Sequence, residues 1–155
     1  MNKITSFTID HTTLNPGIYI SRIDGDITTY DLRFIKPNAS ANPNYPLLTN
    51  SQMHSFEHLF ATFARNSQIA SDVIYFGPMG CQTGFYFLVK NSDSQKTINI
   101  INQILVDIIN YDGDMPGDSP KECGNYMNLN INEAKKIATE FYNITKNWKV
   151  ADLEY

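Results

Sequence analysis

Hydrophobic and polar positions alternate in four short segments, which is typical of strands with one buried face. The clearest is residues 28–35, where apolar Tyr30, Leu32 and Phe34 are separated by charged side chains. A polar link at residues 24–26 predicts a hairpin between this segment and the one before it. The other three strands are expected at residues 18–23, 72–76 and 84–90.

Three longer segments repeat apolar side chains every three or four positions, which predicts helices with one buried stripe. They begin near Thr49, Ser94 and Asn130, each of which is a residue type that caps helix N-termini. Gln52 and Glu133 lie three residues after the first and third of these caps, as in a capping box. The first helix is expected to end near Arg65.

Strands and helices mix along the chain, and the strands are joined by hairpin-like links rather than by long crossovers. This order favours an α+β fold in which helices pack on an antiparallel sheet, a two-layer α/β sandwich. A length of 155 residues fits a single domain covering residues 1–155.

The composition excludes several function classes. The net charge is −4 and the 12 Lys and Arg residues are scattered, so no basic surface for nucleic acid or for a membrane is expected. No apolar stretch is long enough to span a bilayer, and the N-terminal residues lack the apolar core of a signal peptide. We therefore expect a cytoplasmic protein, in which Cys81 and Cys123 are not a structural disulfide.

Candidate chemistry is concentrated in residues 54–58 of the first helix, His-Ser-Phe-Glu-His. His54 and His58 are one turn apart on the same helix face, so both imidazoles can bind one divalent cation. Glu57 lies about 60° around the axis from His54, where its carboxylate can reach a bound water or substrate. The alternative is a helix with two incidental histidines.

A catalytic metal site usually has three protein ligands and one open position. Cys123 is the best candidate for the third ligand, because a thiolate binds zinc or ferrous iron strongly and Cys123 follows a flexible loop. Cys81 lies in the glycine-rich connection 77–84, where it can face a pocket as a base or nucleophile. The alternative for Cys81 is a small buried thiol.

The spacing of His54, Glu57 and His58 also occurs in inverted-zincin metalloproteases, in which the glutamate activates a zinc-bound water. Three features weaken this alternative. The chain is short for such a protease, and a peptidase has no evident use for Cys81. Cys123 would also replace the downstream glutamate that those proteases use as third ligand. A metal-binding module without catalysis is a further alternative, but such a module needs neither Glu57 nor Cys81.

Five ordered blocks of this sequence resemble the S-ribosylhomocysteine lyases, the LuxS proteins that make the autoinducer-2 precursor. The blocks include Ser6-Phe7 to Asp10-His11, Asp31-Leu32-Arg33-Phe34, His54 to Leu59, Pro78 to Gly84, and Cys123-Gly124 followed by Glu133-Ala134-Lys135. The sequence departs from the family pattern at Tyr75 and Gly77, where that pattern has aspartate and serine. A divergent homologue with an altered substrate is therefore an alternative.

The resemblance implies a metal held by His54, His58 and Cys123, which in the family is ferrous iron with zinc as a possible substitute. It implies that Glu57 and Cys81 are the acid–base groups. The implied reaction moves the substrate carbonyl along the ribose and then eliminates homocysteine, leaving 4,5-dihydroxy-2,3-pentanedione.

Ser6, His11 and Arg33 correspond to substrate-binding positions of the family. The family is a homodimer with two sites at the subunit interface, which implies that Ser6 serves the partner's site. From the local pattern alone, His11 would be a surface or capping residue, and Arg33 would be solvated on the strand face opposite the apolar one.

Overall fold

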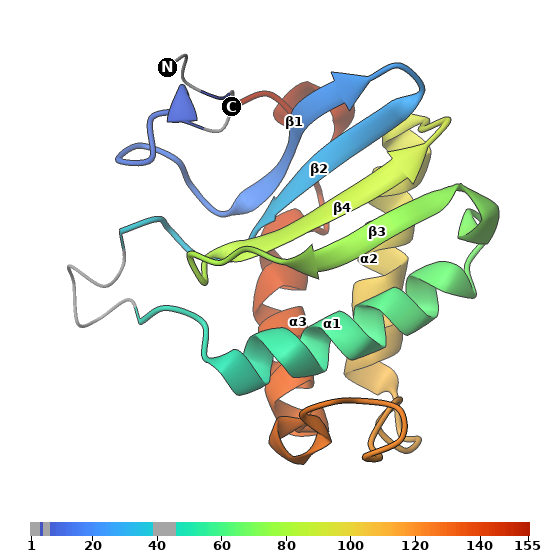
Figure 1. Ribbon diagram of the computed structural model, residues 1–155. Coiled ribbons are helices and arrows are strands. Elements are labelled where there is room, and N and C mark those ends of the chain that lie inside the picture. Colours follow the sequence, from blue (N-terminus) through green and yellow to red (C-terminus); the bar gives the residue numbers. More distant parts are fainter. Residues whose placement is uncertain (1–3, 5–6, 39–45) are drawn as a thin grey trace.

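The computed structural model describes residue 4, residues 7–38 and residues 46–155. Its centre is one antiparallel sheet with the strand order β1-β2-β4-β3, as expected from the hairpin-like links (Figure 1). The strands are β1 (Gly17–Asp24), β2 (Ile27–Arg33), β3 (Val73–Pro78) and β4 (Gly84–Lys90). The predicted α+β class is confirmed, and each strand lies within about two residues of its expected bounds.

Glycines shape two of the strand connections. Gly25 closes the β1–β2 hairpin with a φ of 61°, a left-handed conformation that glycine adopts without a steric penalty. Gly84 pairs with Arg33 across β2 and β4, and a Cβ atom at Gly84 would overlap the carbonyl oxygen of Leu32. The close approach of the two backbones therefore requires glycine at the start of β4.

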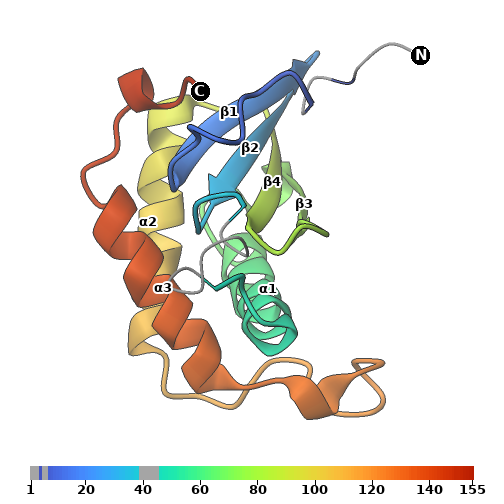
Figure 2. The same ribbon diagram turned by 90° about the vertical axis from the view of Figure 1, so that its left-hand side faces the viewer.

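Three helices lie along one face of the sheet (Figure 2). They are α1 (Asn50–Arg65), α2 (Ser94–Asn110) and α3 (Ile131–Thr145), with short 3₁₀ turns η3 (Ala70–Asp72), η4 (Tyr126–Asn128) and η5 (Val150–Asp152). Thr49 and Asn130 cap α1 and α3 as predicted, and Gln52 completes the capping box of α1. The predicted cap Ser94 is wrong: the Asp93 side chain accepts from the amide of Lys96 instead.

The core is built from the apolar faces of the sheet and the helices, as the alternation predicted. Its centre is aromatic, with several rings in stacked or edge contact. These rings belong to Phe34, Phe56, Phe60, Phe76, Phe85, Phe87 and Phe141. α1 lies against this cluster, so the positions of His54 and His58 are fixed by a buried helix face.

The opposite face of the sheet is partly covered by the C-terminal end of the chain. Tyr155 stacks on Tyr19 of β1 with ring centroids 4.9 Å apart, and the Leu153 carbonyl accepts from the amide of Ile20. Figure 1 shows the C-terminus lying beside β1. This covering buries Asp31 and Arg33, which are 1% and 2% exposed. The expectation of a solvated Arg33 is therefore wrong.

Within the described residues, no helix combines the length and the apolar character needed to cross a membrane.

Candidate active site

His54, His58 and Cys123 converge, with one potential ligand atom from each lying within 4.8 Å of the other two. Both histidines are on α1, and Cys123 lies in the connection between α2 and α3. The Cys123 Sγ is 3.3 Å from the His54 Nε2. The structure thus brings together the three residues proposed as ligands, although Cys123 is far from the other two in sequence.

Outer hydrogen bonds orient both imidazoles. The His58 Nδ1 is 2.8 Å from the Pro116 carbonyl oxygen, to which it can only donate. The His54 Nδ1 contacts the side-chain oxygen of Asn128 in the same way. These bonds place the ring protons on Nδ1 and leave each Nε2 with a free lone pair, the tautomer that a metal-ligating histidine needs.

The connection between α2 and α3 runs beneath α1 (Figure 1) and is hydrogen-bonded to it. Ser51 donates to the Asn128 carbonyl at 2.8 Å, and the amide of Asn130 donates to the buried Ser55 hydroxyl at 2.8 Å. The amide of Asn125 donates to the Cys123 sulfur at 3.4 Å. The sequence reasoning did not find these anchoring residues, because no local pattern predicts the docking of a loop.

This donor set fits a divalent transition metal. Two imidazole nitrogens and one thiolate suit zinc or ferrous iron, and three protein ligands leave a position open for water or substrate. The oriented lone pairs on His54 and His58 and the amide donated to Cys123 stabilise the metal-binding forms of these side chains. The residues therefore can hold a catalytic metal.

A second group of predicted residues lines a cavity of about 490 Å³. His11, Arg33 and Cys81 all contribute to its wall, together with Thr83 and Tyr86. His11 reaches it from the N-terminal segment, with its Nδ1 2.9 Å from the Ile9 carbonyl oxygen. Three residues that lie far apart in sequence therefore share one cavity, of a size that suits a small molecule.

Arg33 is held from behind by Asp31, whose Oδ2 lies 2.5 Å from the Arg33 Nη2. Burial raises the pKa of Asp31, and the attraction of Arg33 offsets this only in part. Burial acts to lower the pKa of Arg33, but the adjacent Asp31 carboxyl outweighs it, and the net pKa of Arg33 is raised. The guanidinium therefore remains a fixed cation at the cavity wall.

Two predicted residues stand outside these groups. Glu57 is half-buried on α1 beside His58, but in the described part of the chain it belongs neither to the converging ligand atoms nor to the cavity wall. Ser6 lies outside the described residues. Their roles stay predictions.

The two departures from the family pattern are linked in space. A Cβ atom at Gly77 would overlap the ring of Tyr75, so the tyrosine fills the space that a side chain at position 77 would occupy. Tyr75 is 49% exposed and does not belong to the cavity wall formed by the described residues. The tyrosine and the glycine therefore form a matched pair on the sheet surface.

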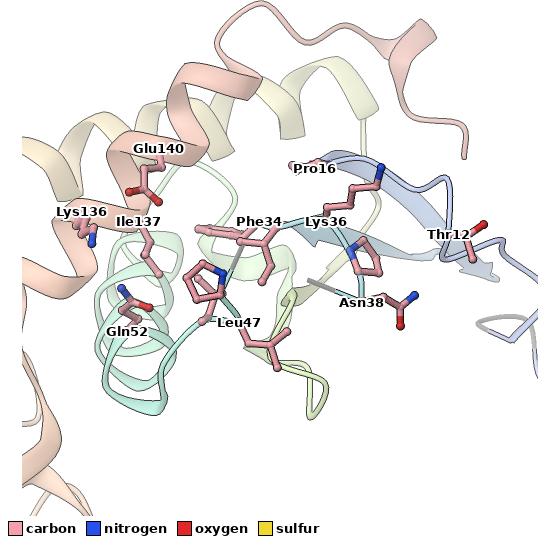
Figure 3. A pocket seen from close by; sticks show the side chains of 14 residues that line it. Thr12, Pro16, Phe34, Lys36, Asn38, Leu47, Gln52, Lys136, Ile137 and Glu140 are labelled. Carbon is pink, nitrogen blue, oxygen red and sulfur yellow. The ribbon is translucent and has the colours of Figure 1, made fainter. Parts of the chain in front are cut away.

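A larger cavity of about 780 Å³ lies elsewhere, between the end of β2, the start of α1 and the face of α3 (Figure 3). Phe34, Leu47, Gln52, Ile137 and Glu140 line it. Its wall includes Asn38 and Pro46, which border residues 39–45 outside the described ranges. None of the predicted site residues that the structure describes lines it, so this larger cavity is separate from the group that His11, Arg33 and Cys81 form.

Comparison with known proteins identifies the family of the chain. The sequence matches the S-ribosylhomocysteinase (LuxS) family over residues 4–152. It is 44% identical to an S-ribosylhomocysteine lyase of Finegoldia magna and to one of Borreliella afzelii, each over all of this chain and 99% of the relative. It is 43% identical to that of Clostridium beijerinckii over 92% of this chain and 91% of the relative. The chain therefore belongs to the S-ribosylhomocysteinase (LuxS) family.

Proposed function

We propose that this enzyme cleaves S-ribosylhomocysteine to homocysteine and 4,5-dihydroxy-2,3-pentanedione, the autoinducer-2 precursor. The observation that carries the proposal is the convergence of His54, His58 and Cys123 in a chain whose relatives are named for this activity. The inverted-zincin alternative is weaker, because a cysteine accompanies the two histidines in this cluster and that class uses a downstream glutamate.

The ligands in this proposal are His54, His58 and Cys123, and the ion is ferrous iron, for which zinc can substitute. Bound there, the metal supplies Lewis-acid polarisation of a substrate oxygen. Asn128 and the Pro116 carbonyl hold the two imidazoles in their metal-binding tautomer. We place the enzyme in the cytoplasm, where reducing conditions keep Cys81 and Cys123 free.

Cys81 and Glu57 move the protons in the proposed reaction. A proton on the carbon next to a carbonyl is acidic enough for a thiolate or a carboxylate to remove, and its return to the adjacent carbon shifts the carbonyl along the ribose. Once the carbonyl is at C3, removal of the proton from C4 expels homocysteine from C5. Two bases on different sides of the sugar serve successive transfers.

Arg33 and His11 bind the substrate in this scheme, since both lie in the cavity wall with Cys81. The fixed positive charge of Arg33 suits oxygen-rich or anionic groups of the substrate. Ser6 completes the site from the second subunit of a homodimer. Sedimentation equilibrium tests the dimer: a protein that is monomeric at assay concentration and active would contradict the shared site.

The deciding experiment follows free thiol released from S-ribosylhomocysteine by anaerobically purified, iron-loaded protein. We expect thiol release by the native chain and losses of at least about 100-fold in Glu57→Gln and Cys81→Ala, as is typical when a general acid–base group is removed. Circular dichroism and metal content must match the native protein in both variants. A folded, metal-loaded native protein that releases no thiol would reject the proposal for this substrate.

A further inference from the structure

A line of hydrogen bonds leads from the buried ion pair to Cys81. The Arg33 Nη1 lies 2.5 Å from the Thr83 hydroxyl oxygen, and this oxygen lies 3.0 Å from the Cys81 sulfur. Asp31 holds the other terminal nitrogen of Arg33 at 2.5 Å. From this arrangement we propose that Thr83 is a positioning residue, which holds the Cys81 sulfur in the cavity and donates a hydrogen bond to its thiolate.

The direction of these bonds follows from the donor inventory. A guanidinium has only donors, so the Thr83 oxygen accepts from Arg33. A hydroxyl has one proton, which is then free to point at the Cys81 sulfur. A thiolate can only accept, so the charged form of Cys81 completes a chain in which every bond runs from donor to acceptor. The cation at Arg33 polarises the hydroxyl and strengthens its bond to sulfur.

Thr83 is fixed far more firmly than Cys81. Its side chain is buried, and its carbonyl accepts from the amides of Phe34 and Ile35 at 3.0 and 3.2 Å, which ties it to the end of β2. A β-branched side chain also has few rotamers. Cys81 is exposed and lies within the turn that the Gln82 amide closes by donating to the Met79 carbonyl, so its backbone is ordered but its side chain is not packed. The hydroxyl is therefore the rigid element that selects one position for the sulfur.

The charged and titratable groups around Cys81 come from three elements. His11 lies on the N-terminal segment, Arg33 on β2 with Asp31 behind it, and Tyr86 on β4. Burial, followed by the charge of Asp31, raises the pKa of Tyr86, so this phenol is neutral at physiological pH. Arg33 is thus the permanent charge at this wall, and its described bond towards Cys81 runs through Thr83.

The inference rests on the proposed role of Cys81 as an acid–base group, but its test does not need turnover. Metal-loaded protein is alkylated with iodoacetamide over a range of pH, and peptide mass mapping separates Cys81 from Cys123. Thr83→Val removes the hydroxyl and keeps the shape. We expect it to move the pH of half-maximal Cys81 alkylation upward by about one unit, a tenfold equilibrium effect that is ordinary for a hydrogen bond to a charged group.

Two comparisons separate positioning from general stability. Thr83→Ser keeps the hydroxyl and should return the profile to within about 0.3 units of the native one. Thr97→Val makes the same substitution at an equally buried threonine on α2, bonded to Ser92 and Asp93, and should leave the profile unchanged. If Thr83→Val does not fold, Thr83→Ala removes the same hydroxyl without adding an atom and is compared in its place.

Turnover supplies the second readout. Thr83→Val should lower kcat for thiol release about tenfold with KM changed less than about twofold, and Thr83→Ser should recover most of the loss. Coinciding alkylation profiles of the native and valine proteins would overturn the role of Thr83. If the valine variant shifts the alkylation profile but the native chain releases no thiol, the positioning role of Thr83 is supported and the lyase assignment is rejected.

Discussion

At the scale of single residues, Gly117 shows how one backbone conformation supports the metal ligands. Its φ is 74°, and a Cβ atom there would come within 2.9 Å of the His58 ring. We expect Gly117→Ala to cost about 1–2 kcal/mol in backbone strain and to displace His58. Metal affinity should fall by at least about tenfold, as measured by competition with a coloured chelator.

The control for this prediction lies in the same loop. Gly124 has no heavy atom within 4 Å of an added Cβ and does not need a positive φ, so Gly124→Ala should bind metal with nearly native affinity. Equal affinities in the two alanine variants would show that the contact between Gly117 and His58 does not matter.

Tyr75 and Gly77 give a second residue-scale prediction. Gly77→Ser forces the exposed Tyr75 ring to rotate away, whereas the shorter aspartate in Tyr75→Asp leaves room for the serine. A double-mutant cycle by urea unfolding should therefore give a coupling energy of roughly 0.5–1.5 kcal/mol, with serine less costly in the aspartate background. Strictly additive effects would mean that the two positions are independent.

At the scale of elements, local pattern was sufficient for the helices and strands but not for the loops. The caps Thr49 and Asn130 and the alternation around Tyr30 are local signals, and the structure agrees with them. Spacing within α1 also placed His54 and His58 together. The docking of the α2–α3 connection depends on hydrogen bonds to Ser51 and Ser55. No local sequence pattern distinguishes these two serines from any other serine on a helix.

The same limit explains the error at Arg33. Alternation correctly put Asp31 and Arg33 on the face opposite the core, but it carried no information about what covers that face. Tyr155, near the C-terminus, donates a hydrogen bond to Asp31. The alternation of apolar and polar residues along a strand cannot predict that a distant segment covers the polar face. Ser55 is a comparable case on α1, because it is a polar residue with a fully buried side chain.

Ser55→Ala tests the docking of α3 on α1. The Ser55 hydroxyl accepts the amide of Asn130, the N-cap residue of α3, so its loss leaves a backbone donor without this partner. We expect a loss of about 1–3 kcal/mol in the free energy of unfolding. The matched control is Thr139→Ala on the outer face of α3, whose exposed hydroxyl donates to the Lys135 carbonyl of the same helix. Equal losses in both variants would contradict a docking role.

At the scale of the whole molecule, the proposed metal joins α1 to the α2–α3 connection. A ligand that binds only the folded state stabilises it by about 2.7 kcal/mol when present at 100 times its dissociation constant. Chelation should therefore lower the unfolding midpoint by roughly 5–10 °C for a domain of this size, and added metal should restore it. Calorimetry checks this, with His58→Ala as the control in which chelation should change nothing. Identical unfolding midpoints of the native protein with and without metal would contradict a metal that joins these two segments.

The buried pair of Asp31 and Arg33 links the middle of the sheet to the end of the chain, and its titration is a property of the folded molecule. Burial raises the pKa of Asp31 in the folded state above its unfolded value of about 3.9. The stability that this group contributes is fully present below that value and is lost as the pH rises through the folded pKa. The free energy of unfolding of the native protein, relative to Asp31→Asn, should therefore fall as the pH rises from 4 towards 8. Urea unfolding across this range measures the difference, and the opposite slope would show that the attraction of Arg33 outweighs the burial of the carboxyl.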